Sequence, residues 1–84
     1  MDSFLVETYV PRVRRGEARE AGRRARAAAE ELAGEGIRIR YVRTTILPED
    51  EMCFHLFEAQ SVEAVEEASR RAALGAIRVV GAVE

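Results

Sequence analysis

The sequence predicts a single α+β domain over residues 1–84, with four strands and two helices in the order βαββαβ. In four short segments, apolar and polar residues alternate with the period of a strand. In two longer segments, apolar residues recur every three or four positions, which is the period of a helix. Proline and glycine residues separate these segments, and a chain of 84 residues has the length of one domain with a thin core.

The first half of the chain predicts a strand followed by a long helix. Residues 3–10 carry the β-branched and aromatic side chains of a strand, and Pro11 ends it because proline cannot donate to a sheet ladder. A helix is predicted over residues 16–33, and Gly34 and Gly36 supply left-handed positions beyond its end. The face predicted to be buried is made of small residues and one leucine: Ala18, Ala21, Gly22, Ala25, Ala28, Ala29 and Leu32.

The second half predicts a hairpin, a helix and a last strand. Residues 37–46 and 51–59 are expected to be strands joined by a turn at residues 48–50. Ser61 is expected to cap a second helix that runs to about Ala73, and residues 76–83 supply the last strand. The buried stripe of this helix is expected to be Val65, Ala68 and Ala72.

This order of elements specifies the ferredoxin-like βαββαβ plait. In that arrangement a four-stranded antiparallel sheet has the spatial order 4-1-3-2, and both helices pack on one face. The first and third strands are then neighbours at the centre of the sheet.

The alternation within the strands predicts which side chains face the helices. We expect the core face to carry Phe4, Val6, Ile37, Ile39, Phe54, Leu56, Ile77 and Val79. The opposite, open face should carry the polar and titratable residues Glu7, Tyr9, Arg38, Arg40, Cys53, His55 and Arg78, together with Leu5, Val42, Phe57, Val80 and Ala82. Such a face is too apolar to stay exposed, so we expect a second copy to cover it in a homodimer.

Charge is distributed unevenly along the chain. Seven arginines but only two glutamates lie between Arg12 and Arg26, in a chain whose net charge is −2. Clustered positive charge suits phosphate binding, but the basic segment has no aromatic residue on which bases could stack, so nucleic-acid binding is not expected. A basic leader and a membrane-length apolar run are both missing from the sequence, so we expect a cytoplasmic protein without membrane partners.

Several segments resemble a known family. They are FLVE at residues 4–7, the hairpin, CFHLFEA at 53–59, SVEAV at 61–65 and RRA at 70–72. These segments are similar to the small bacterial ferredoxin-like proteins catalogued as a domain of unknown function, a family that includes a nickel-binding, nickel-responsive member. The resemblance implies a ferredoxin-like homodimer with affinity for Ni²⁺ or another divalent metal. Relatives often carry histidine where this chain has Arg43 and Ala68.

The predicted function is binding of a small ligand, such as a divalent metal, on the open face of a homodimer. Imidazole, thiolate and carboxylate groups are the donors that nickel and zinc prefer, so His55, Cys53 and Glu7 are the candidate metal ligands. A two-fold dimer would double this set. In the plainer alternative, His55 is a hydrogen-bonded interface residue and Cys53 a small buried one. Tyr9, Arg40, Phe57 and Arg78 are the candidate residues for an open-face ligand or interface.

The alternative function is catalytic. Dimeric α+β barrels of this fold include cofactor-free monooxygenases and isomerases, in which a histidine or tyrosine handles a proton. By that analogy His55 would be the base, and Tyr9 or Arg40 would stabilise an oxyanion formed on a small carbonyl compound.

Overall fold

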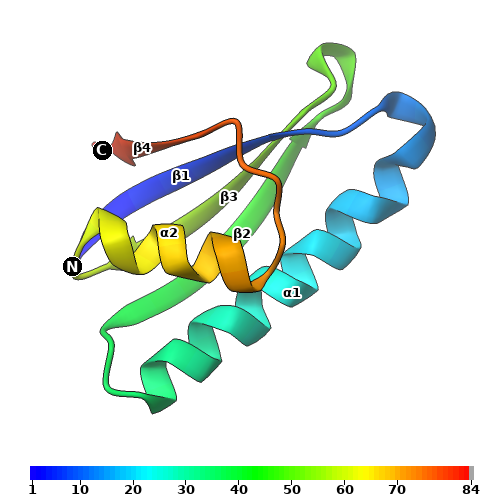
Figure 1. Cartoon of the computed structure of the whole chain (residues 1–84). Helices are drawn as coiled ribbons and strands as arrows, with labels where there is room; N and C mark the ends of the chain where they lie inside the picture. The colour runs from blue at the N-terminus through cyan, green and yellow to red at the C-terminus, as the bar shows by residue number, and fades with distance from the viewer. Residues whose placement is uncertain (84) are drawn as a thin grey trace.

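The computed structural model describes residues 1–83 and consists of a four-stranded sheet with two helices on one face (Figure 1). The elements are β1 (Asp2–Tyr9), α1 (Arg15–Gly34), β2 (Ile39–Leu47), β3 (Met52–Ala59), α2 (Val62–Arg71) and β4 (Arg78–Ala82). Short 3-10 turns at Arg12–Arg14 and Pro48–Asp50 precede α1 and β3. The predicted βαββαβ order is therefore confirmed.

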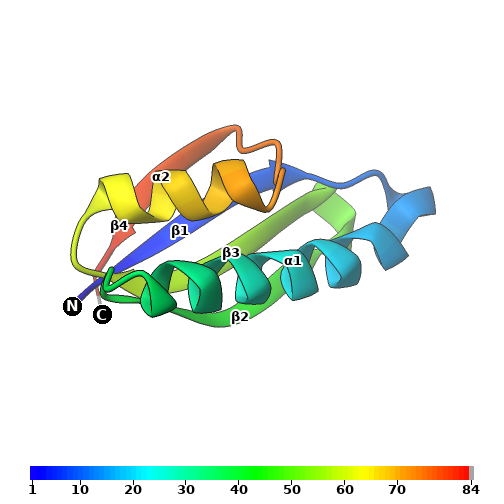
Figure 2. The ribbon, with the colours of Figure 1, turned by 60° about the horizontal axis from the view of Figure 1, so that its bottom comes forward.

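The sheet has the order β2-β3-β1-β4, which is the predicted 4-1-3-2 order read in reverse. All three strand pairs are antiparallel, and β1 and β3 lie at the centre. Figure 2 shows α1 and α2 side by side on the same side of the sheet, with α1 along β2 and β3 and α2 along β1 and β4. The protein has a ferredoxin-like fold.

Both helices bury the stripes that their sequences predict. Alanines and Gly22 line the buried face of α1, so its backbone can lie close to the sheet. In α2 the Ser61 hydroxyl accepts a hydrogen bond from the backbone N–H of Ala64 at 3.2 Å, which confirms the predicted N-cap. Val65, Ala68 and Ala72 are buried. Within residues 1–83, neither helix has the length and apolar character that crossing a membrane requires.

β3 buries the face that was expected to be open. Cys53, His55 and Phe57 have no exposed surface and lie beneath the helices, whereas Phe54 and Leu56 lie half-buried on the open face. The alternation of residues in β3 does not predict which face is buried, because the strand has large apolar residues on both faces. The pairing with β1 decides the question: His55 lies opposite Val6, the most buried residue of β1.

The other strands mostly follow the predicted alternation. Phe4, Val6, Ile39 and Val79 face the core, and Glu7, Arg40 and Arg78 lie on the open face, as expected. Ile77 is a second error in the predicted core, because it precedes β4 and is 59% exposed.

β2 contains a bulge that the sequence did not predict. Its pairing with β3 shifts register between Tyr41 and Arg43, so Val42 is the extra residue. In a regular strand, residues three positions apart point to opposite faces. Because of the bulge, Tyr41 and Thr44 both point toward the helices.

Candidate functional site

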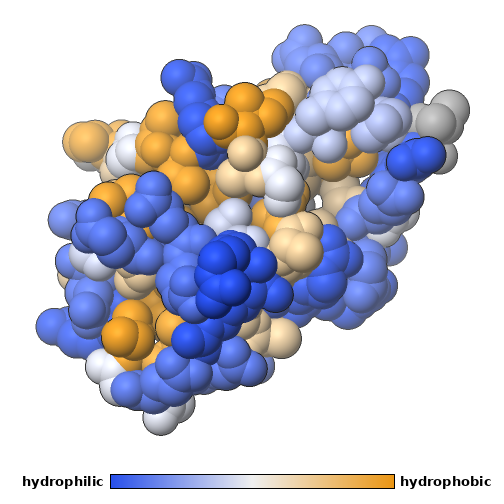
Figure 3. All heavy atoms as spheres, in the orientation of Figure 1, coloured by the Kyte–Doolittle hydropathy of each residue, from blue (hydrophilic) through white to orange (hydrophobic). Residues whose placement is uncertain are grey.

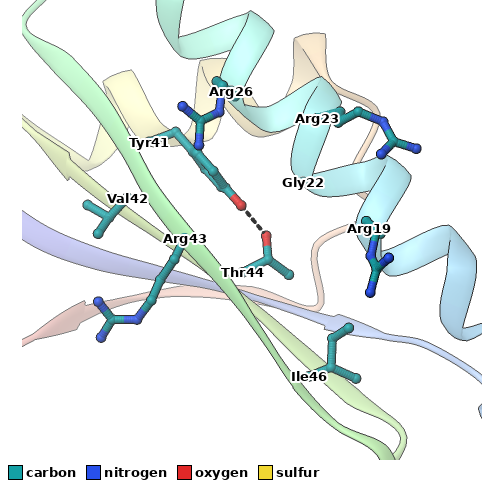
Figure 4. Close-up of a pocket in the computed structure, with 9 residues that line it drawn as sticks. All are labelled: Arg19, Gly22, Arg23, Arg26, Tyr41, Val42, Arg43, Thr44 and Ile46. Atoms are coloured by element: carbon teal, nitrogen blue, oxygen red, sulfur yellow. Dashed lines mark hydrogen bonds between the residues drawn. The ribbon is translucent and has the colours of Figure 1, made fainter.

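A cleft of about 380 Å³ opens between α1 and β2, and we call it the α1–β2 cleft (Figure 4). Helix α1 lines one wall with Arg19, Gly22, Arg23 and Arg26. Strand β2 lines the other with Tyr41, Val42, Arg43, Thr44 and Ile46. Sites for small molecules in proteins typically have volumes of about 300 to 1,000 Å³. The cleft therefore has room for a small ligand.

The positive charge of the cleft is only partly compensated. Arg23 forms an ion pair with Glu20 at 2.6 Å and points away from the Tyr41 hydroxyl (Figure 4). The Arg26 guanidinium lies 5.2 Å from the centre of the Tyr41 ring, a cation–π contact that holds it at the rim. Within residues 1–83, neither Arg26 nor Arg19 has a carboxylate oxygen within 4 Å. The guanidinium groups of Arg19 and Arg26 thus remain available to an anion, whereas Arg43 points away from the two hydroxyls (Figure 4).

The surface around α1 is hydrophilic, whereas apolar atoms gather over β1 and β4 and the segment before β4 (Figure 3). The polar character of the cleft wall therefore comes from the arginines of α1.

Two hydroxyl groups meet at the floor of the cleft because Gly22 faces them. The Tyr41 and Thr44 hydroxyl oxygens are 2.5 Å apart. A Cβ atom at position 22 would lie 2.8 Å from the Thr44 oxygen and 3.0 Å from the Tyr41 oxygen, which is closer than packed atoms tolerate. Glycine costs about 1 kcal/mol relative to alanine within a helix. The close approach of two side chains is the physical reason for a glycine here.

From the floor a chain of hydrogen bonds runs into the core. The Thr44 hydroxyl lies 2.8 Å from Nδ1 of His55, and Nε2 of His55 lies 3.6 Å from the sulfur of Cys53. Burial, with a smaller contribution from the Arg24 charge, lowers the pKa of His55 from 6.5 to about 4. Burial also raises the pKa of the Cys53 thiol, against a smaller opposing effect of the Thr8 hydroxyl. At neutral pH this chain of hydrogen bonds therefore contains the neutral imidazole of His55 and the protonated thiol of Cys53.

The residues predicted for the open face are divided between the two faces of the sheet. Glu7 pairs with Arg78, and Arg40 with Glu58, all on the open face. Tyr9 is 58% exposed at the end of β1. Phe57 was wrongly placed there: it is buried beneath the helices, with its ring edge-on to that of Tyr41.

The predicted metal ligands do not form a metal centre. His55 and Cys53 lie together beneath the helices, whereas Glu7 is on the other side of the sheet and is held by Arg78. A protonated thiol is a poor ligand, and Thr44 already occupies Nδ1 of His55. Within residues 1–83, no three His, Cys, Asp or Glu side chains form a group able to hold a metal ion. A dimer through the open face would not add His55 or Cys53 to a shared centre.

The predicted catalytic arrangement is not formed either. His55 has no exposed surface and both of its ring nitrogens have partners, so a substrate cannot reach it directly. Tyr9 and Arg40 lie on the opposite face of the sheet. The group that His55 does reach is the Tyr41 hydroxyl, through Thr44.

Sequence reasoning missed the cleft itself. Arg19, Arg26, Tyr41 and Thr44 come from two elements, and the bulge that orients the last two leaves no clear pattern in the sequence. The one available signal was Gly22, a glycine inside an alanine-rich helical stripe.

Comparisons with known proteins establish the fold. No protein-family model matches the chain, and no curated protein sequence matches it significantly. The structure is similar to the crystal structure of SCO4226 from Streptomyces coelicolor A3(2), with a TM-score of 0.78 over 98% of this chain and 96% of that chain. The two sequences are 16% identical. At this identity the likeness extends to the fold alone, and the chain has a ferredoxin-like fold similar in architecture to that of SCO4226.

Proposed function

We propose that this protein binds a small molecule through an oxyanion, a carboxylate or phosphate group, in the α1–β2 cleft. The observation that carries the proposal is the placement of Arg19 and Arg26, without carboxylate partners, beside the paired hydroxyls of Tyr41 and Thr44. The predicted role as a ligand-binding protein is retained, but the proposed site moves from the open face to the helix side of the sheet.

The chemistry of the lining groups favours an oxyanion. Guanidinium groups present planar pairs of N–H donors that match the oxygens of carboxylate and phosphate. The chain as a whole is acidic, with a net charge of −2, so attraction of an anion depends on the local excess of arginine along α1. A neighbouring hollow of about 430 Å³ shares Arg19 and Ile46 with the cleft and adds Arg15. This extension gives room for the rest of an anionic molecule.

The test is calorimetric titration of the protein with inorganic phosphate and with acetate at low ionic strength. We expect binding with a Kd of about 1 mM or tighter that weakens as salt is added. The variant Arg19→Gln/Arg26→Gln should lose about tenfold or more in affinity, since a hydrogen bond to a charged group contributes about 1.5–3 kcal/mol.

The matched control is Arg14→Gln/Arg38→Gln, which removes the same charge from positions outside the cleft. It should bind phosphate nearly as the unmodified protein does. Equal losses in the two double variants would mean that net charge, and no particular site, attracts the anion, and the proposal would be wrong.

We further propose that a second copy covers the open face. Leu5, Leu56 and Val80 lie side by side at its centre, with Glu7–Arg78 and Arg40–Glu58 toward opposite ends of the strands. An apolar centre flanked by charges of both signs is suited to a contact with a two-fold related copy. The α1–β2 cleft is on the other side of the sheet, so a dimer of this kind leaves it open.

Binding of Ni²⁺ stays a prediction from the family resemblance. Titration of the same protein with NiCl₂, compared with the His55→Ala variant, tests it. Binding tighter than about 1 mM that disappears in the variant would support it, and its absence would contradict it.

A further inference from the structure

Four side chains connect the α1–β2 cleft to the core in one continuous chain. They are Tyr41, Thr44, His55 and Cys53, joined by contacts of 2.5, 2.8 and 3.6 Å. Elements β2 and β3 supply them, and the bulge in β2 places the first two on the same face. Within residues 1–83, no buried side-chain nitrogen or oxygen lacks a hydrogen-bond partner, so no nitrogen or oxygen of these four side chains is orphaned.

The positions of the heavy atoms allow two directions of donation. In the inward direction, Tyr41 donates to Thr44, Thr44 donates to Nδ1 of His55, and Nε2–H of His55 points at the Cys53 sulfur. In the outward direction, the Cys53 thiol donates to Nε2, Nδ1–H donates to Thr44, Thr44 donates to Tyr41, and Tyr41 is free to donate into the cleft. The two directions correspond to the two neutral tautomers of one imidazole. On going from inward to outward, the Nε2–H bond of His55 breaks and an Nδ1–H bond forms, by proton exchange with water during a local opening of the fold. Tyr41, Thr44 and Cys53 each keep one proton and only reorient their O–H or S–H bonds.

The links must reverse together. The Thr44 hydroxyl has one proton, so it cannot donate to Tyr41 and to His55 at once. A neutral imidazole likewise carries its single proton on one nitrogen, and burial keeps His55 neutral. A reversal of the hydrogen bond at Tyr41 therefore reverses the next link as well and reaches His55 through two hydrogen bonds.

The charge in the cleft decides the direction. Hydroxyl dipoles orient in the local field. In the free protein the cations of Arg19 and Arg26 attract the Tyr41 oxygen and repel its proton, which favours the inward direction. An oxyanion between the arginines reverses the field at Tyr41 and accepts its proton in a hydrogen bond, which favours the outward direction.

We infer that binding of an oxyanion in the α1–β2 cleft reverses this chain and converts His55 from the Nε2–H to the Nδ1–H tautomer. Tyr41 is then a specificity-determining residue, because it donates to ligands that accept a hydrogen bond. This inference rests on the proposed function, since it requires that an oxyanion occupies the cleft.

The experiment is ¹⁵N NMR of the imidazole, with inorganic phosphate as the probe. His55 is the only histidine of the chain, so the uniformly labelled protein gives one pair of ring signals. Without phosphate, Nε2 should have the shift of a protonated nitrogen and Nδ1 that of an unprotonated one. Saturating phosphate should exchange the two shifts.

Two variants identify the path. Thr44→Val removes the central hydroxyl, so phosphate should still bind but leave the His55 signals unchanged, and Thr44→Ser should restore the response. Tyr41→Phe should weaken phosphate binding by about tenfold, the effect of losing one hydrogen bond to a charged group. Circular dichroism checks that each variant is folded, and Tyr41→Phe, which removes the hydroxyl at the cleft end, provides the test if Thr44→Val does not fold.

The outcomes separate this inference from the proposed function. Phosphate that binds by calorimetry but leaves the tautomer of His55 unchanged would overturn the inference and leave the proposed function intact. The inference is also wrong if Tyr41→Phe binds phosphate as tightly as the unmodified protein. If no phosphate binds, the proposed function fails first and the inference fails with it.

Discussion

At the scale of one residue, Gly22 shows how packing between α1 and β2 opposes the preference of a helix for alanine. In α1 alone, alanine would be the better residue at this position by about 1 kcal/mol. The facing hydroxyls of Thr44 and Tyr41 occupy the space that a methyl group would need. Thr44 cannot move easily, because it is β-branched and its hydroxyl contacts both Tyr41 and His55. The Tyr41 ring is held by Arg26 and Phe57.

We therefore expect Gly22→Ala to destabilise the protein by about 1 kcal/mol, because overpacking costs about 1–3 kcal/mol and outweighs the gain in helix propensity. Gly16→Ala is the matched control, since a Cβ there meets nothing within 4 Å in the part of the chain that the structure describes, and it should be neutral or stabilising. Urea denaturation measures the free energy of unfolding of both variants. The penalty should shrink when Gly22→Ala is combined with Thr44→Ala; an unchanged penalty would show that the cause lies elsewhere.

His55 couples stability to pH. Unfolded chains bind a proton at this histidine with a pKa near 6.5, whereas the folded chain does so only near 4. Between these values the unfolded state binds more protons. The contribution of the neutral, buried ring is thus fully present above pH 6.5 and is lost as the pH falls through that window.

Urea denaturation at several pH values should show this loss. The shift from 6.5 to about 4 corresponds to about 3 kcal/mol of unfolding free energy. His55→Gln has no group that titrates at this position, so its stability should depend on pH much less between 6.5 and 4. Equal pH dependence in the two proteins would contradict the assignment to His55.

At the scale of elements, α1 and α2 are joined at their C-terminal ends by one arginine. Arg71 of α2 pairs with Glu67 on its own helix and with Glu31 and Glu35 at the end of α1. Hydrogen bonds from Arg70 and then Arg71 lower the pKa of Glu67 from 4.5 to about 2, and Arg71 also lowers that of Glu35. Ion-pair networks of this kind contribute more to the free energy of unfolding than isolated surface pairs do.

The variant Arg71→Gln should be less stable than the unmodified protein at neutral pH. Folded-state carboxylates with lowered pKa values stabilise above pH 4.5, and their contribution is lost as the pH falls toward about 2, so the difference should narrow over that range. Arg23→Gln, which removes an ion pair within α1 alone, should have a smaller effect. Thermal denaturation between neutral pH and about pH 2 compares the stability of each variant with that of the unmodified protein. If the stability lost in Arg71→Gln were the same at every pH, the Arg71 network would not be its cause.

The strands of this protein differ in how far their sequences predict their faces. In β1 the alternation of Val6 and Glu7 is clear, and the predicted faces are confirmed. In β3 the pair Phe54 and Phe57 puts a large apolar residue on each face, so the strand could be turned over without an obvious loss of burial. Counting His55 as a surface residue selected the wrong face, because a histidine with both nitrogens satisfied can be buried.

At the scale of the whole molecule, the helices cover one face of the sheet and leave the other face uncovered. The centre of the open face is the row Leu56, Leu5 and Val80 across three strands. A second copy over this row would remove these side chains from water.

Sedimentation equilibrium should show a dimer. Leu56→Lys places a charge at the centre of the open face and should give a monomer, because a buried unpaired charge is costly. Ala27→Lys, on the exposed side of α1, introduces the same residue in the other layer and should leave the dimer intact. A monomer for the unmodified protein at concentrations up to about 0.1 mM would contradict the proposed assembly.

The sequence by itself determined the order of elements, the sheet order, and the buried stripes of both helices. These follow from local periodicity, from the residues that end each segment, and from the few topologies that short connections allow. Only the tertiary structure decided which face of β3 is buried, because both faces are apolar and the pairing with β1 makes the choice. It also decided where Tyr41 and Thr44 meet the arginines of α1, because the bulge in β2 and the approach of two elements distant in sequence are not encoded in any local pattern.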